Sequence, residues 1–176
     1  MGNEAEAEVC LSVSPVARRE GCISMQNQLA EAWGGFLSRY RWDWFLTLTF
    51  REPVVSFRAH RLFSYFARDI EKAVEIPIAW FRGDELGWRG GRLHFHSLML
   101  NVAHLRRLSW MDQWERRAGF ARILPFDRQK GAAFYCAKYV TKQFGDWEIS
   151  DNLTAFSHYQ EPMFRGKGMK KDGNEG

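Results

Sequence analysis

Two histidines with one residue between them are the first candidates for chemistry in this sequence. His94 and His96 lie in the apolar stretch 92–100, which follows Gly90 and Gly91. The stretch predicts a β-strand, and strand side chains alternate between the two faces of a sheet, so both imidazoles should project from one face. Two adjacent imidazoles make half of a divalent-metal site. Alone, the pair is more typical of polar residues on a solvated sheet face.

A second chemical motif begins at residue 135. Tyr135, Lys138, Tyr139 and Lys142 follow the spacing i, i+3, i+4, i+7, which places them on one stripe of a helix over 135–142. The stripe would present two phenols, which are candidate nucleophiles, and two ammonium groups that can stabilise negative charge. An ordinary amphipathic helix can carry such a stripe, so the motif is specific only together with the histidine pair.

Together these motifs resemble the HUH endonucleases, and specifically the rolling-circle replication initiator (Rep) proteins of plasmids and phages. Three blocks occur in the family's order: Phe45-Leu46-Thr47-Leu48-Thr49-Phe50, His94-Phe95-His96, and Tyr135 to Lys142. The resemblance implies a metal-dependent endonuclease and strand transferase that nicks single-stranded or stem-loop DNA at a replication origin. It also implies a 5′-phosphotyrosine intermediate, a free 3′-hydroxyl, and magnesium or manganese as the cofactor.

The resemblance also implies roles for single residues. Tyr135 and Tyr139 would be the nucleophiles, with Tyr135 the first choice if only one of them acts. Lys138 and Lys142 would be their electrostatic partners. Two tyrosines one helical turn apart would permit a second transesterification in the same site.

The third metal ligand is expected to be Glu85. If Gly90 and Gly91 form a two-residue hairpin turn, paired residue numbers sum to 181, and Glu85 stands directly opposite His96. Asp84 would need a three-residue turn to reach the same position and is the second choice. The family takes its third ligand from an acidic residue upstream of the histidines, which supports Glu85.

Four further residues are candidates for DNA contact. Thr47 and Thr49 alternate with apolar residues in a strand predicted over 44–50, although threonine is also an ordinary strand former. Arg89 and Arg92 flank the glycines before the histidine strand.

The order of elements predicts an α+β fold, with an antiparallel central β-sheet and helices packed on it, as in the RRM-like palm of HUH nucleases. Strands are expected over 44–50, 76–82, 92–100, 120–126 and 147–149. Helices are expected after Ser24, over 56–73, from Ser109 to Gly119, and over 135–142. We expect a flexible N-terminal arm over 1–22, one endonuclease domain over 23–160, and a disordered charged tail over 161–176.

Composition narrows the class of protein. The net charge of +4 suits a polyanionic partner, and three widely spread cysteines give no disulfide framework. The absence of a membrane-spanning run and of a signal peptide predicts a cytoplasmic location and no membrane partner. Because the sequence has no phosphate-binding Gly-x-x-x-x-Gly-Lys-Ser/Thr loop, strand unwinding would come from a host helicase.

Other classes stay open. A transposase or a relaxase could be built from the same parts, although a relaxase usually has three metal-binding histidines. A non-catalytic RRM-like nucleic-acid-binding module would use its aromatic residues for base stacking. A structural metal-binding protein would not need the Tyr/Lys stripe. A cupin site is excluded, because positions 99 and 100 are Met and Leu where a glutamate would be needed.

Overall fold

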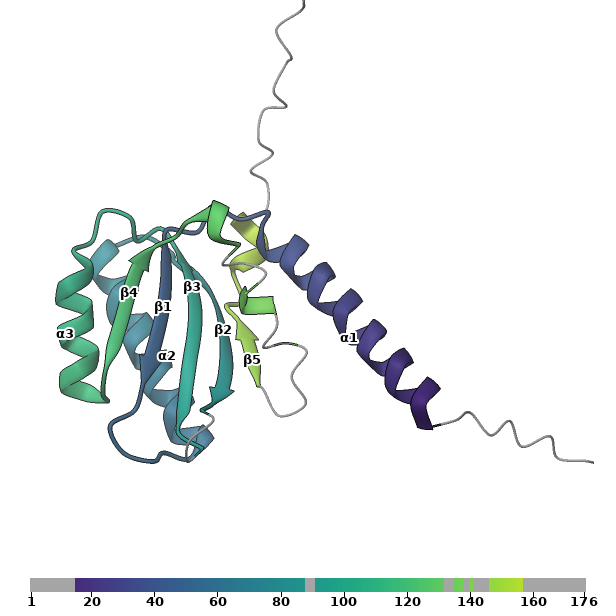
Figure 1. Cartoon of the computed structure of the whole chain (residues 1–176). Coiled ribbons are helices and arrows are strands. Elements are labelled where there is room, and N and C mark those ends of the chain that lie inside the picture. Colours follow the sequence, from purple (N-terminus) through teal and green to yellow (C-terminus); the bar gives the residue numbers. More distant parts are fainter. Residues whose placement is uncertain (1–14, 88–90, 132–134, 138–139, 141–145, 157–176) are drawn as a thin grey trace, which may run out of the picture.

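The computed structural model describes residues 15–87, 91–131, 135–137, 140 and 146–156. Its centre is a five-stranded sheet in the order β4-β1-β3-β2-β5, in which all neighbouring strands are antiparallel (Figure 1). The elements are α1 (Pro15–Leu37), β1 (Trp44–Thr49), α2 (Ser56–Val74), β2 (Ala79–Leu86), β3 (Leu93–Leu100), α3 (Arg107–Arg117), β4 (Ala121–Pro125), η1 (Arg128–Lys130), β5 (Trp147–Ile149) and η2 (Leu153–Phe156). The predicted α+β class with an antiparallel sheet is confirmed.

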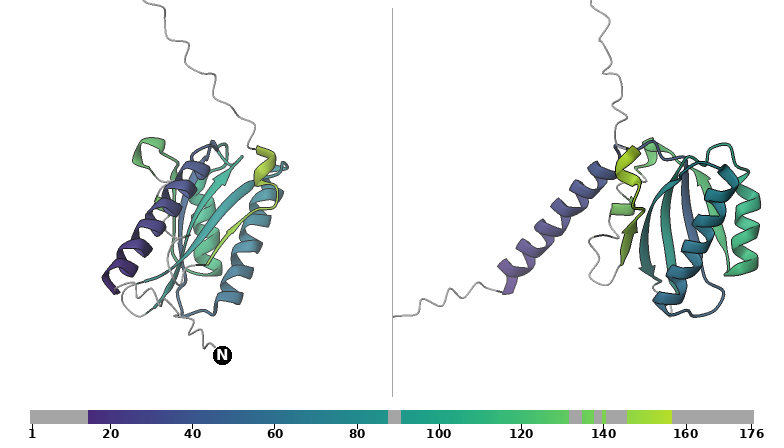
Figure 2. Two further views of the ribbon diagram at one scale, coloured as in Figure 1. Left: turned by 90° about the vertical axis from the view of Figure 1, so that its right-hand side faces the viewer. Right: turned by 180° about the vertical axis from the view of Figure 1, so that it is seen from behind.

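Helices lie on both faces of this sheet. Helices α2 and α3 cover one face, and α1 approaches the other (Figure 2). Along β1 the buried residues Trp44, Leu46 and Leu48 point to the α2 side, where they pack with Phe66 and Trp114 in the larger core. A smaller core on the other face joins the end of α1 to β2 and β3 and includes the buried Cys136.

The first helix is longer than the sequence suggested. It begins at Pro15 rather than after Ser24, and proline is favourable in the first turn of a helix because its fixed φ suits that position. Its C-terminal end packs on the sheet, where the Trp33 ring lies 4.5 Å from that of Trp147. Met25 remains 65% exposed, and Figure 1 shows the helix running away from the sheet. Among the described residues, no helix has the length and apolarity needed to cross a membrane.

The hairpin between β2 and β3 differs from the prediction. Leu86 pairs with Leu93 and Glu85 with His94, so paired numbers sum to 179 rather than 181. The backbone N–H of Gly87 donates to the carbonyl of Arg92 at 2.8 Å, which closes a longer connection than a two-residue turn. The predicted Gly90-Gly91 turn is therefore wrong. Since the register moves by two residues, every side chain keeps its predicted face.

Gly119 joins α3 to β4 at a point where the backbone passes very close to the end of β1. A Cβ atom at Gly119 would lie 2.5 Å from the amide nitrogen of Arg51 and 2.6 Å from the carbonyl oxygen of Thr49, whereas a Cβ at Gly35 would meet nothing within 4 Å. We expect Gly119→Ala to lower the free energy of unfolding by about 1–3 kcal/mol, as overpacking does. Gly35→Ala, in helix α1, should raise it by about 0.5–1 kcal/mol. Urea denaturation followed by circular dichroism measures both, and equal stability of the two variants would contradict the close approach.

Candidate active site

The sheet face opposite α2 carries the predicted cluster of one carboxylate and two imidazoles. Glu85 stands directly opposite His94, and its Oε2 atom lies 3.0 Å from Nε2 of His96. The contact with His96 is therefore diagonal, because directly opposite His96 on β2 is Gly83, which has no side chain. The structure thus brings Glu85, His94 and His96 to one face, by a register two residues away from the expected one.

His96 is held in place on two sides. Its ring is buried, its Nδ1 atom lies 3.4 Å from Oγ1 of Thr47, and its Nε2 atom faces Glu85. A neutral His96 that donates from Nε2 to Glu85 would accept the Thr47 hydroxyl hydrogen at Nδ1. An ion bound at Nε2 would move the proton to Nδ1 and make Thr47 the acceptor, which is the usual outer support of a ligating histidine. The Phe45 ring lies nearly parallel to the imidazole, with centroids 6.2 Å apart.

The surroundings of His94 favour its neutral form. Partial burial lowers the pKa of His94, Glu85 opposes that shift, and the nearby Arg92 guanidinium adds to the lowering. Space for the ring depends on Gly87, since a Cβ atom there would lie 2.8 Å from Nε2 of His94. An imidazole must be deprotonated to bind a metal, so this environment favours ligation.

Tyr135 lies against the histidine strand. Its ring centroid is 5.6 Å from that of His96 and 6.0 Å from that of Phe45, and both contacts are edge-on. The tyrosine side chain is 41% exposed, whereas Cys136 and Ala137 after it are fully buried. Residues 135–137 and 140 are helical, as predicted. Three other members of the stripe, Lys138, Tyr139 and Lys142, fall outside the described residues.

The other candidates for DNA contact have different surroundings. The hydroxyl of Thr49 donates to the carbonyl of Phe120 at 3.0 Å, so it joins β1 to the start of β4. Arg92 is exposed and lines a small cavity of about 260 Å³ together with Thr49. Arg89 lies outside the described residues.

Asp84, the second choice for a metal ligand, points to the opposite face. Its Oδ2 atom lies 2.7 Å from Nε2 of His60, and its Oδ1 atom accepts a hydrogen bond from Nε of Arg82 at 3.1 Å. Arg82 also bonds Glu148 at 2.7 Å. The expectation that Asp84 could replace Glu85 is therefore wrong, because consecutive strand residues face opposite sides.

This second cluster was not foreseen from the sequence. Ligand atoms of His60, Asp84 and Asp146 all lie within 4.8 Å of one another, so these residues could hold a metal ion. His60 comes from α2, and no sequence spacing links it to β2 or to Asp146. Both carboxylate oxygens of Asp84 already have partners, so an ion there would compete with His60 and the Arg82 guanidinium.

Comparison with known proteins gives one match. The family model for the replication-associated protein ORF2/G2P matches residues 43–144, more than half of the chain. The chain belongs to the replication-associated protein ORF2/G2P family. No curated protein and no solved structure matches it. The matched region of this ORF2/G2P protein contains all three sequence blocks, and its family supports the prediction of a Rep-like replication initiator.

Opposite charges act on His94 in this ORF2/G2P protein, and they predict opposite effects of two neutral substitutions. Because Glu85 raises the pKa of His94 and Arg92 lowers it, Glu85→Gln should move the His94 titration to lower pH and Arg92→Gln to higher pH. Metal-free protein, titrated by NMR of the imidazole carbons, measures both directions. Shifts of the same sign in both variants would contradict the described surroundings.

Proposed function

We propose that this protein is a metal-dependent endonuclease and strand transferase of the HUH type, which nicks single-stranded or stem-loop DNA to initiate rolling-circle replication. The observation that carries the proposal is the contact between Tyr135 and His96, two residues of motifs separated by about forty positions. A helix that only covered the sheet would need to pack apolar side chains on it. A partly exposed phenol beside a cluster of one carboxylate and two imidazoles is instead typical of a reactive site.

The donor set suits a divalent cation. Glu85, His94 and His96 supply one carboxylate oxygen and two imidazole nitrogens from two paired strands, and Glu85 and His96 are already within 3.0 Å of each other. Magnesium prefers oxygen ligands, whereas manganese accepts imidazole more readily, so this set favours manganese. When bound, the ion would polarise a non-bridging phosphate oxygen and offset the charge that develops there.

The tyrosine would act as the nucleophile. Its phenolic oxygen gives up its proton to solvent and forms a bond to phosphorus. The bond from phosphorus to the 3′ oxygen breaks, and that oxygen takes up one proton from solvent and leaves as a 3′-hydroxyl. The product is a 5′-phosphotyrosine. Phenol has a pKa of about 10, so the attacking oxygen needs nearby positive charge, which we assign to Lys138 and Lys142. A second tyrosine, Tyr139, would allow the reverse transfer that rejoins the strand.

The two candidate metal clusters can be separated by a pair of histidine substitutions. We expect His96→Ala to weaken manganese binding by more than about 100-fold, since even outer-shell changes cost 10- to 100-fold. His60→Ala, on the other side of β2, should leave manganese affinity unchanged. Isothermal titration calorimetry on the full chain measures both affinities. Loss of binding in His60→Ala, but not in His96→Ala, would move the metal to the cluster with Asp84 and Asp146.

The nucleophile is tested by tyrosine-to-phenylalanine variants. Wild type, Tyr135→Phe, Tyr139→Phe and the double variant are incubated with manganese and a labelled stem-loop pool whose loop is randomised. We expect a covalent protein–DNA adduct from wild type, a reduced yield from Tyr135→Phe, and none from the double variant, because both candidate phenols are then absent.

Tyr65→Phe is the matched control, because Tyr65 is partly exposed on α2, on the other side of the sheet. It should form as much adduct as wild type. An adduct from the double variant would exclude both tyrosines as nucleophiles. DNA binding without any adduct in wild type would favour a non-catalytic binding module, and joining of mobile-element ends would favour a transposase.

A further inference from the structure

A cavity of about 680 Å³ adjoins the candidate site on the β1–β4 side of His96. Its volume lies in the range of pockets that hold small organic ligands. His96 and Tyr135 form its boundary with the candidate site, and its other lining residues come mainly from β1, β4 and the turn after β4. A single DNA strand bound across the candidate site would therefore pass the opening of this cavity.

Strand pairing places Arg122 at one end of the cavity and the apolar pair Phe45 and Leu124 farther along it, and the turn after β4 adds Asp127 and Lys130, which pair with each other at 3.3 Å. Thr47 pairs with Arg122, and two residues along the strands Phe45 pairs with Leu124. Thr47 stands opposite His96 and Phe45 opposite Leu98, so the Arg122 end lies nearer His94 and Glu85, although the Phe45 ring also contacts His96. Successive same-face positions on a strand are about 6.7 Å apart. One nucleotide can span that distance, with its phosphate at the arginine and its base on the apolar pair.

The apolar end is preformed and partly exposed. The Phe45 ring is fixed between His96 and Tyr135 by the contacts described above, and Leu124 is 37% exposed on an open sheet face. A preformed aromatic and aliphatic surface of this kind binds a base with little loss of conformational freedom.

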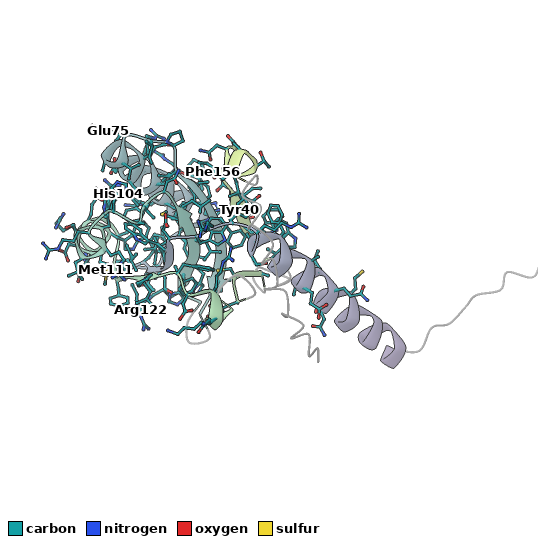
Figure 3. The ribbon with its side chains drawn as sticks, turned by 90° about the horizontal axis from the view of Figure 1, so that it is seen from above. Tyr40, Glu75, His104, Met111, Arg122 and Phe156 are labelled. Atoms are coloured by element: carbon teal, nitrogen blue, oxygen red, sulfur yellow. The ribbon has the colours of Figure 1, made fainter. Side chains whose placement is uncertain are left out.

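The polar end carries a cation available for a ligand. Arg122 is exposed, and within the part of the chain that the structure describes it forms no ion pair with a carboxylate. Figure 3 shows Arg122 on the side of the sheet away from α2, which is the side of the histidine cluster. A guanidinium in this position matches a phosphate diester.

We propose that this cavity binds the base of one nucleotide next to the scissile phosphate, while Arg122 binds a phosphate of the same nucleotide. The proposal rests on the proposed function, which brings a single strand to His96. If one unpaired base occupies the cavity, that base helps to determine where the DNA strand binds and therefore where it is cut.

The test measures binding without divalent metal, so that cleavage does not interfere. A single-stranded ligand is selected from a randomised pool by affinity, and abasic sites are then placed in it one position at a time. In wild type, one position should weaken binding by roughly 5- to 150-fold, the range for loss of one stacked base. Fluorescence anisotropy with the full-length protein gives each dissociation constant.

Leu124→Trp should fill the apolar end of the cavity. We expect this variant to bind the intact strand as weakly as wild type binds the sensitive abasic strand, with no further loss at that position. Leu108→Trp, an equally large change at an exposed leucine of α3, should behave as wild type. Circular dichroism checks the fold, and the smaller Leu124→Ala variant should give an intermediate loss.

Arg122→Gln should weaken binding to intact and abasic strands alike and lower the salt dependence by about one phosphate contact, while Arg116→Gln on α3 should not. A flat abasic scan in wild type would overturn the proposal, as would a sensitive position that survives in Leu124→Trp. Base-sensitive binding without any adduct would leave the cavity assignment standing and reject the nuclease. An adduct with no base-sensitive position would do the opposite.

Discussion

The pairing of β3 with β1 on one side and β2 on the other fixes the strand-borne part of the candidate site, which is Glu85 and the two histidines. His96 stands between Thr47 and Gly83, and His94 between Thr49 and Glu85. Because side chains alternate along all three strands, one face receives the imidazoles, the hydroxyls and the carboxylate, while the other receives the large apolar side chains of the main core. Burial of that core on α2 and α3 therefore also determines which residues reach the opposite face.

The face of the sheet that packs on α2 also contains buried polar groups that need partners. Arg82 is almost fully buried, with its guanidinium carbon 5.1 Å from the ring centroid of Phe95, and it bonds both Asp84 and Glu148. A buried charge is costly unless it is paired, and here two carboxylates from β2 and β5 supply the pairs. His60 adds α2 to the same network. Consecutive residues of β2 thus have different roles. Asp84 links β2 to α2 through His60, and Glu85 lies with the histidines on the other face.

Local pattern was enough to predict much of this arrangement. Period-two alternation predicted β1, β3 and the common face of the two histidines, and helical periodicity predicted α2 and the turn at Tyr135. The register of the β2–β3 hairpin was missed, because it depends on a connection whose length two glycines do not specify. The error was harmless to the carboxylate, since a shift of two residues preserves the face of Glu85.

Long-range contacts could not be predicted from spacing. Three such features are the approach of His60 to Asp84, the stacking of Phe45 on His96 and the cavity beside Arg122. Each joins residues that are far apart in the chain, and neither strand nor helix periodicity relates their positions. The length of α1 was also missed, because residues 1–22 show no sustained apolar periodicity in the sequence. Such features follow from tertiary packing, which overrides local propensity.

Strand order has a consequence for the tyrosine. Strands β4 and β5 are the two outer strands of the sheet, so the chain between Gly131 and Asp146 must travel the full width of the sheet, about 19 Å for four strand spacings. The two ends of this segment join opposite edges of the sheet. None of the described strand pairs includes a residue between them. Cys136 and Ala137 within this segment are fully buried, so added residues would have to fall on either side of them, where each doubling of a loop's length costs only about 0.6 kcal/mol. The position of the Tyr135 phenol and the stability of the sheet can therefore change independently of each other among related proteins.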